Sequence, residues 1–474
     1  MATVLSPDIC VIGAGSAGLS VAAGAAAFGV PVVLIERERM GGECLNTGCV
    51  PSKALIAAAK HAHAVRKAAE FGVNAGEPVI DFEKVQAHVR SVIDAIAPND
   101  SVERFTAMGV TVIRADARFT DPDTVAAGGV AIRARRFVIA TGSSTIIPPI
   151  PGLAAIDYLT NETLFDLKSL PQHLVIIGAG PVGLEMAQAH RRLGAKVTVV
   201  DAGRALAKED PELSGIVLDR LRGEGIDMFE HSRVLSVEKT ATGLRLHCET
   251  QTGLVTIDGS DLLIATGKKG NTSGLGLEDA GIAVTATGIA VDGSLRTLNR
   301  RVYAIGDAAG GLQFTHAANY HASLVLREIL FRLPSRENRG IVPRATFTDP
   351  EIASVGLGEG EARARYGKVE VLRWPYADND RAQAERSTAG LIKIITGRRG
   401  KILGVGIAGA GAAEMISMWS VIISNGQGLS HVRNAIVPYP TMTEIGKRAV
   451  IAYYTPLTRT PFVRAIIRLL RRFG

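Results

Sequence analysis

The sequence GGECLNTGCVPSKAL, residues 41–55, places Cys44 and Cys49 five residues apart where a glycine-rich segment leads into a helix. On an ideal α-helix their Cα atoms would lie about 8.6 Å apart, beyond the ~7 Å limit for a disulfide. A bridge therefore needs a distorted turn, and Gly48 permits one. The N-terminal end of the helix would favour a thiolate at either cysteine. We expect a redox-active dithiol here, rather than an inert disulfide or two buried thiols.

The composition describes a large, packed α/β protein. The 474 residues include 52 glycines, 47% hydrophobic residues and only 5% aromatic residues, which is typical of packed α/β sheets with many tight turns. This length predicts about three domains. The net charge is +7, with basic residues spread along the chain except at its far end. Because stacking aromatic residues are also scarce, we expect no binding of nucleic acid.

The sequence favours a cytoplasmic protein. The first predicted strand begins by Ile9, which leaves no room for a signal peptide, and no apolar run reaches the roughly 18 residues of a membrane span. Cys10 and Cys248 lie in apolar, strand-like surroundings and are expected in the core. No pair among the ten histidines has the spacing of a helical metal site, so no metal site is predicted.

Residues 8–37, DICVIGAGSAGLSVAAGAAAFGVPVVLIER, form a complete phosphate-binding strand–helix–strand unit. Gly13 would make the tight turn, Gly15 would let the backbone approach a pyrophosphate, and Gly18 would let the helix pack on the strand. Glu36, at the end of the second strand, can accept ribose hydroxyls. A glycine-rich turn without a ligand is the alternative, but strand, helix and terminal acid are all present.

The same arrangement recurs in residues 174–203, LVIIGAGPVGLEMAQAHRRLGAKVTVVDAG, with Gly178, Gly180 and Gly183 in the turn. Asp201 ends the next strand, and an acid there favours the free 2′-hydroxyl of NADH over the phosphate of NADPH. Arg204, three residues on, could soften that preference. The chain is therefore predicted to bind two dinucleotides.

Two dinucleotide sites and a dithiol imply an electron relay. Nicotinamide would give hydride to a flavin, and the flavin would pass two electrons to the disulfide. We assign FAD to the first fingerprint because that site is adjacent in sequence to the cysteines, and NAD(P)H to the second.

Three further segments complete a pattern that covers nearly the whole chain: ATGSSTIIPPIPG at 140–152, VYAIGDAAG at 302–310 and TFTDPEIASVGL at 346–357. Together with the cysteine segment and both fingerprints, they resemble the class I FAD-dependent pyridine nucleotide-disulfide oxidoreductases. The Cys-x4-Cys pair and the long interface-type segment look most like the mercuric reductase and dihydrolipoamide dehydrogenase branches of that family.

The resemblance implies a role for each site residue. Cys44 would be the interchange thiol facing the substrate, and Cys49 the thiol against the flavin. Lys53 would pair with Glu185 beside the flavin, and Asp307 would bind its ribityl chain. Further cofactor contacts are expected from Gly42, Thr141, Gly142, Gly267 and Gly306.

The resemblance also implies a fold and a domain order. The fold class is α/β, with two Rossmann-like domains for FAD and NAD(P) and a C-terminal α+β dimerisation domain, so a homodimer is expected. The FAD domain would span 1–145, the NAD(P) domain 146–269, a return to the flavin site 270–343 and the interface domain 344–455. After the second ATG the usual arginine and proline are replaced by GKKGN, residues 267–271, which loosens the local turn assignment.

The C-terminal part departs from the disulfide reductases of the family at one decisive position. Those enzymes carry a His-Pro-Thr-x-x-Glu segment whose histidine shuttles a proton, whereas this chain has Tyr439 there and keeps the acid as Glu444. A tyrosine, with a reference pKa near 10, is a poor base at neutral pH. Mercuric reductases also have tyrosine at this place, but this chain lacks their C-terminal cysteine pair.

The prediction is therefore a mercuric-reductase-like flavoprotein whose acceptor is a soft metal ion, a disulfide, a quinone or another small molecule. A true dihydrolipoamide dehydrogenase is disfavoured by Tyr439. A non-catalytic flavoprotein that acts as redox sensor or scaffold is disfavoured by the intact cysteines and the Lys53 and Glu185 pair.

Residues 456–474 form a basic amphipathic tail. Its apolar residues Phe462, Val463, Ile466, Ile467, Leu470 and Phe473 are set against Arg464, Arg468, Arg471 and Arg472. Such a helix could dock on the protein's own dimer or make a peripheral contact with an anionic membrane surface.

Overall fold

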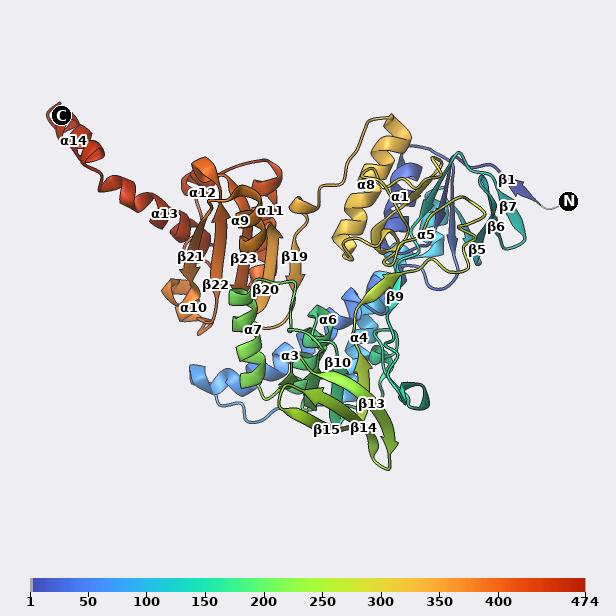
Figure 1. Cartoon of the computed structure of the whole chain (residues 1–474), viewed down its shortest axis with the longest axis horizontal. Coiled ribbons are helices and arrows are strands. Elements are labelled where there is room, and N and C mark those ends of the chain that lie inside the picture. The colour runs from blue at the N-terminus through green and yellow to red at the C-terminus, as the bar shows by residue number, and fades with distance from the viewer. Residues whose placement is uncertain (1–2, 474) are drawn as a thin grey trace. The chain divides into compact units, whose positions relative to one another are not determined.

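The computed structural model describes residues 3–473 and divides into two compact units (Figure 1). The first unit contains residues up to 204 together with 226–338, and the second contains 205–225 together with 339 onward. Each unit is built around its own sheets and is described separately below.

A five-stranded parallel sheet, in the order β18-β8-β2-β3-β4, carries the first glycine turn. Its strands are β2 (Ile9–Ile12), β3 (Val32–Glu36), β4 (Thr111–Arg114), β8 (Arg136–Ile139) and β18 (Val302–Ala304). β2 and β3 are buried throughout, as expected for parallel strands covered on both faces. Helices α1 (Ser16–Ala27) and α8 (Thr315–Phe331) lie side by side, and Gly24 makes room for Leu326 between them (Figure 1).

A second, mostly antiparallel sheet shares a core with the first. It has the order β1-β7-β6-β5, with β1 (Val4–Leu5), β5 (Ala117–Asp121), β6 (Thr124–Ala127) and β7 (Val130–Ile132). Phe119 of β5 meets Phe137 of β8 edge-on at 5.3 Å within that core. The helices between β3 and β4 are α2 (Gly42–Asn46), α3 (Cys49–Lys67), α4 (Phe82–Ile96) and α5 (Val102–Ala107).

The second glycine turn belongs to a four-stranded parallel sheet in the order β12-β11-β10-β16. Its strands are β10 (His173–Ile177), β11 (Lys196–Val200), β12 (Asp227–Phe229) and β16 (Asp261–Ile264), with α6 (Pro181–Leu193) between β10 and β11. An antiparallel meander of β13 (Arg233–Thr240), β14 (Gly243–Thr250) and β15 (Gly253–Gly259) packs against it. β9 (Ser143–Thr145) pairs with β17 (Lys268–Gly270) where the two ATG segments end.

The second unit is built on a five-stranded antiparallel sheet, in the order β19-β20-β23-β22-β21. The strands are β19 (Arg344–Thr346), β20 (Glu351–Gly356), β21 (Glu370–Pro375), β22 (Leu391–Thr396) and β23 (Ile402–Gly409). Its helices are α7 (Pro211–Gly223), α9 (Glu359–Tyr366), α10 (Asp380–Ala384), α11 (Ala412–Ser424), α12 (Leu429–Asn434), α13 (Glu444–Thr458) and α14 (Pro461–Leu470).

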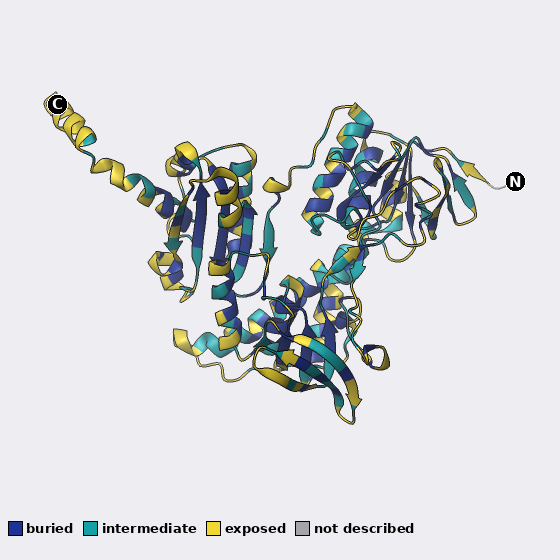
Figure 2. Cartoon of the chain, viewed as in Figure 1, coloured by how far each residue is buried: buried dark blue, intermediate teal, exposed yellow. Residues whose placement is uncertain are grey.

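The buried strands of the second unit are dark in Figure 2, and its core gathers around Trp419 of α11, which is 1% exposed. α7 packs on β20 and β23, although in sequence it falls between two strands of the second parallel sheet. The predicted fold class, with two Rossmann-like domains and a C-terminal α+β domain, is confirmed. Cys10 and Cys248 are buried, as predicted.

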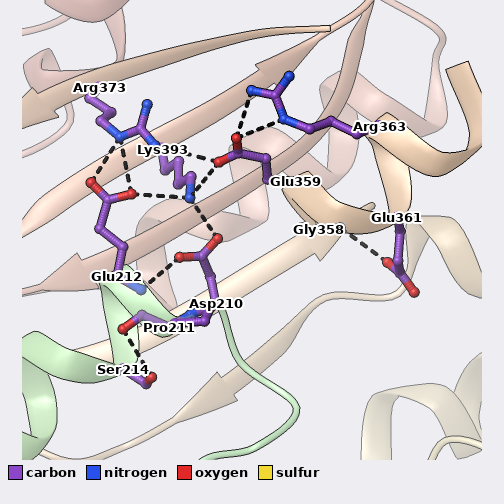
Figure 3. Close-up of polar contacts among 10 residues, drawn as sticks. All are labelled: Asp210, Pro211, Glu212, Ser214, Gly358, Glu359, Glu361, Arg363, Arg373 and Lys393. Carbon is purple, nitrogen blue, oxygen red and sulfur yellow. Dashed lines mark hydrogen bonds and ion pairs between the residues drawn. The ribbon is translucent and has the colours of Figure 1, made fainter. Parts of the chain in front are cut away.

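A buried lysine ties α7 to the sheet of the second unit (Figure 3). The side chain of Lys393, on β22, is 6% exposed, and its Nζ lies 2.8 Å from Asp210, 3.1 Å from Glu212 and 2.8 Å from Glu359. Burial alone would lower the pKa of Lys393, but the three carboxylates raise it. The hydrogen bond from Lys393 lowers the pKa of Glu359 to about 2. Since a buried charge is costly unless it is paired, the buried Lys393 ammonium depends on these carboxylates.

We predict that Lys393→Met lowers the free energy of unfolding of the second unit by about 3 kcal/mol, because it removes the buried cation that Asp210, Glu212 and Glu359 share. Trp374 and Trp419 are the chain's two tryptophans and both belong to this unit, so their fluorescence in a urea titration reports its unfolding. Glu359, with its pKa lowered from 4.5, stabilises the fold above pH 4.5, and this contribution is lost as the pH falls toward about 2. In the Lys393→Met variant, the free energy of unfolding should fall less between pH 4.5 and about 2.

Arg363→Met is the matched control, because Arg363 pairs with the same Glu359 but is 52% exposed. Its effect should stay within about 1 kcal/mol. Equal effects of the two substitutions would contradict the assignment of Lys393 as the centre of the cluster.

Candidate active site

The cysteine segment folds as two helices with a break between them. Cys44 lies in α2, which ends at Asn46, and Cys49 is the first residue of α3. The break is at Gly48, whose φ of −130° and ψ of −109° depart from helical values, and a Cβ there would lie 3.0 Å from the carbonyl oxygen of Glu43. The distorted turn that the spacing predicts at Gly48 is therefore present.

A threonine hydroxyl joins the two thiols. Thr315, the first residue of α8, donates from Oγ1 to Cys44 Sγ at 3.1 Å and lies 3.4 Å from Cys49 Sγ. The hydrogen bond between the cysteines lowers the pKa of Cys49 to about 6, and Thr315 and Lys53 act in the same direction. The pKa of Cys44 is raised, first by its hydrogen bond to Cys49 and then by burial. Cys49 is exposed and Cys44 half-buried, so the more exposed thiol is the one favoured as thiolate.

An ion pair links this dithiol helix to the second fingerprint. Lys53 of α3 donates to Glu185 Oε2 of α6 at 2.8 Å. The Glu185 side chain is only 6% exposed, whereas that of Lys53 is 37% exposed. α3 and α6 therefore pack together with a buried carboxylate neutralised at their contact.

The first glycine turn has the geometry of a phosphate cradle. Gly13 has φ +105°, and a Cβ there would lie 2.4 Å from the carbonyl oxygen of Ala140. A Cβ at Gly18 would lie 1.8 Å from the carbonyl oxygen of Gly13, whereas one at Gly15 would meet only Gly42 Cα at 3.8 Å. The backbone at Gly15 is thus open to an anion at the N-terminus of α1.

The second glycine turn repeats these contacts. A Cβ at Gly178, where φ is +114°, would lie 2.3 Å from the Ala265 carbonyl oxygen, and one at Gly183 would lie 2.0 Å from the Gly178 carbonyl oxygen. A Cβ at Gly180 would meet nothing within 4 Å. Both turns therefore fit a dinucleotide pyrophosphate, with the open position in the same register.

The acidic residue that ends the second strand of each fingerprint accepts two backbone hydrogen bonds. Glu36 accepts hydrogen bonds from the N–H of Ala14 at 2.6 Å and the N–H of Glu38 at 2.7 Å. Asp201 accepts from the N–H of Ala179 and the N–H of Gly203, both at 2.7 Å. Each carboxylate is fixed beside its glycine turn, where a ribose would lie.

Asp307 lies at the other end of the first cradle. Ser143 donates to its carboxylate at 2.6 Å, and burial raises the pKa of Asp307. Gly306, with φ +60°, donates its N–H to His321 Nδ1 at 3.1 Å. A half-buried carboxylate beside a serine hydroxyl can hydrogen-bond the hydroxyl groups of a ligand.

The predicted residues of the ATG segments meet at the β9–β17 pair. Thr141 donates to the carbonyl oxygen of Asn271 at 2.8 Å, and the N–H of Asn271 donates to the carbonyl oxygen of Gly142 at 2.9 Å. Gly142 and Gly267 have φ values of +68° and +107°, which only glycine adopts readily.

Sequence reasoning missed an ion pair beside the cysteines. Lys268, one of the residues that replace the usual arginine and proline, donates to Glu43, the residue before Cys44. Asn161 also donates to Glu43, at 3.2 Å. Burial raises the pKa of Glu43, and Lys268 opposes that rise. This ion pair therefore links the cysteine segment to β17, and no local sequence pattern predicts it.

Tyr439 and Glu444 belong to the second unit, whereas both cysteines belong to the first. The Tyr439 hydroxyl is exposed and donates to Asp380 Oδ2 at 3.0 Å, and this bond raises the pKa of Tyr439. Glu444 begins α13 and lies 3.8 Å from Arg448. The phenol is thus held protonated and acts as a hydrogen-bond donor. Within residues 3–473 no group of three His, Cys, Asp or Glu side chains could hold a metal ion.

Comparison with known proteins gives matches along most of the chain. Residues 7–322 match the family model described as "Pyridine nucleotide-disulphide oxidoreductase", and residues 342–450 match the model for its dimerisation domain. Mercuric reductase from Bacillus cereus is 33% identical over 449 residues, which are 94% of this chain and 71% of that protein. Dihydrolipoyl dehydrogenase from Geobacillus stearothermophilus is 32% identical over 463 residues, which are 96% of this chain and 97% of that protein.

A solved structure matches at similar coverage. The Cu(II) complex of the HOCl-induced flavoprotein disulfide reductase RclA from Escherichia coli has a TM-score of 0.84 at 28% identity and covers 94% of this chain and 99% of that one.

We predict that Thr315→Val raises the pKa of Cys49 above about 6, because the thiolate loses a hydrogen-bond donor. Alkylation of the reduced protein by iodoacetamide at pH 6, followed by peptide mass spectrometry, should slow at Cys49 by about three- to tenfold. Thr315→Ser keeps the hydroxyl and should keep the original rate. An unchanged pH profile in the valine variant would show that the hydroxyl does not stabilise the thiolate.

Proposed function

Because the chain belongs to the pyridine nucleotide-disulfide oxidoreductase family, whose members use FAD and NAD(P)H, we propose that it reduces a thiolate-binding acceptor, above all a soft metal ion, through Cys44 and Cys49. The observation that carries the proposal is a dithiol with one thiol of lowered pKa, in a chain that has a protonated Tyr439 where a proton-shuttling histidine is usual. A metal ion such as Hg²⁺ binds thiolates directly and needs no proton from the protein.

The reaction balances as a two-electron transfer. NADH gives up a hydride and becomes NAD⁺, and its two electrons, with one further proton from solvent, reduce the Cys44–Cys49 disulfide to the dithiol. The dithiol binds Hg²⁺ and releases two protons to solvent. It then returns the two electrons to the ion, which leaves as Hg⁰ while the disulfide re-forms. FAD, when bound, supplies the two-electron step between nicotinamide and disulfide. In this scheme Cys44 is the thiol that meets the acceptor, and Cys49 is held as the thiolate first by its hydrogen bond with Cys44 and then by Thr315 and Lys53.

The remaining residues bind and orient. We assign Gly13, Gly15, Gly18 and Glu36 to the FAD dinucleotide, and Asp307 to its ribityl chain. Further FAD contacts come from Gly42, Thr141, Gly142, Gly267 and Gly306. Lys53 and Glu185 would lie between the two cofactors, and the ion pair between them supports this assignment.

The second fingerprint is assigned to NADH. Gly178, Gly180 and Gly183 would cradle the pyrophosphate, and the fixed carboxylate of Asp201 would accept the 2′-hydroxyl and repel a 2′-phosphate. Replacing NADH by NADPH in the turnover assay described below tests this assignment.

The domain order is part of the proposal. FAD is assigned to 1–145 and 270–343, the nicotinamide nucleotide to 146–269 and the interface to 344–455, with β9 and β17 at both crossings. The chain carries the family's dimerisation domain, so we propose a homodimer in the cytoplasm, where thiols stay reduced. Tyr439 and Glu444 would then face the cysteines of the partner copy.

Two findings on relatives support a soft metal acceptor. Mercuric reductases are among the relatives, and the RclA structure is a Cu(II) complex. The dihydrolipoyl dehydrogenase relatives make lipoamide the acceptor to compare against.

The direct test is anaerobic NADH-dependent turnover of the purified protein with mercuric ion plus excess thiol and, separately, with lipoamide. We expect turnover with mercuric ion that Cys44→Ser lowers by at least about 10³-fold, because the electron transfer needs both sulfurs. Turnover with lipoamide should be slow, because Tyr439 stands where a proton-shuttling histidine is usual and a tyrosine is a poor base at neutral pH. Fast, Cys44-dependent lipoamide turnover would overturn the metal assignment, and no turnover with any acceptor would favour a sensor or scaffold.

We expect Tyr439→Phe to lower turnover with mercuric ion by about tenfold, because the phenol oxygen would contact the metal ion at the acceptor site. The rate at which NADH reduces the bound flavin, measured by stopped-flow absorbance, should not change. Tyr366→Phe, another exposed tyrosine of the second unit, is the control. If the Tyr439 variant turns over like the wild type, the residue serves only packing.

A further inference from the structure

The C-terminal segment holds the positive charge of the whole protein. The last 30 residues contain seven lysines and arginines and no aspartate or glutamate, and the chain as a whole has a net charge of +7. The preceding 444 residues are therefore neutral in sum. Any long-range attraction to an anionic surface must come mainly from this one segment.

The segment leaves the packed core of the second unit partway along α13. Val450 is fully buried against the sheet, and Arg433 stacks on the Tyr454 ring at 4.6 Å. From Ile451 to Phe473, however, no residue of the described chain is buried. Figure 2 shows α14 exposed along almost its whole length.

α14 has two opposite faces. At 100° per residue, its apolar side chains cover one half of the helix and its arginines cover the other. The exposed apolar side chains of α14 include Phe462, Ile466, Ile467, Leu469 and Leu470, and Phe473 lies three residues beyond its end. The other face carries Arg464 and Arg468, and Arg471 and Arg472 follow directly after the last residue of the helix. Phe462 is 74% exposed and Phe473 79% exposed, so this apolar face is not covered by the chain itself.

We propose that α14 binds an anionic lipid surface, with its apolar face among the acyl chains and its arginines among the headgroups. The surface of a soluble protein ordinarily mixes both signs of charge, whereas the polar face of α14 carries arginine alone. An apolar half opposite a purely basic half is the pattern of helices that lie in the membrane interface. α14 has ten residues, and no helix within residues 3–473 is long and apolar enough to cross a bilayer, so the contact is peripheral.

The test is co-sedimentation of the full-length protein with vesicles of phosphatidylcholine alone or mixed with phosphatidylglycerol. The protein should sediment with the mixed vesicles at low salt and stay in solution with phosphatidylcholine. The double change Phe462→Ser and Ile466→Ser should abolish sedimentation although every charge remains. The double change Arg468→Gln and Arg471→Gln should weaken binding to the mixed vesicles by about fivefold for each arginine removed.

The matched control changes two other exposed leucines, Leu254→Ser and Leu298→Ser, both 77% exposed and both in the first unit. It should sediment like the wild type. NADH-dependent turnover in solution should be equal in all variants, so this proposal can fail while the proposed function stands.

Two results would overturn the lipid assignment. One is wild-type protein that stays in solution with both kinds of vesicle. The other is a Phe462→Ser, Ile466→Ser variant that still sediments while its dimer mass, measured by light scattering, falls, because α14 would then cover the partner copy instead.

Discussion

The ion pair between Lys53 and Glu185 links the dithiol helix to the second glycine turn. It joins residues 132 positions apart in the sequence, and it does so between the helix that begins with the redox cysteine Cys49 and the helix that begins at the second glycine turn. Glu185 is nearly inaccessible to solvent, so its charge is tolerable only while the lysine neutralises it. The dithiol and the second glycine turn are thereby held at a set separation.

Local patterns in the sequence predict the parts of this site that local physics determines. The glycine turns can be predicted because a Cβ at Gly13 or Gly178 would collide with the carbonyl oxygen of Ala140 or Ala265, so only glycine fits. The break at Gly48 follows from the distance between two cysteines on a helix. The Lys53 and Glu185 pairing was accessible only through resemblance to a family, since neither residue carries a pattern of its own.

Other contacts could not be predicted because their partners are far apart in sequence and chemically ordinary. Thr315 lies 266 residues from Cys49, and Ser143 lies 164 residues from Asp307. Lys268 stands in a segment that departs from the family pattern, and only the folded chain shows that it meets Glu43. The role of a single threonine, serine or lysine can be assigned only when the fold shows which charged or reactive residue it contacts.

The helix α7 has a consequence for how this protein can be divided. Residues 205–225 leave the second parallel sheet, pack on the antiparallel sheet of the other unit and return. A fragment that starts at residue 339 would lack α7, and Lys393 would keep Glu359 but lose both Asp210 and Glu212. The two units are interleaved along the chain, so no single cleavage or gene fusion junction separates them. Recombination that exchanges the C-terminal unit between relatives would need to carry this helix as well, which requires three junctions instead of one.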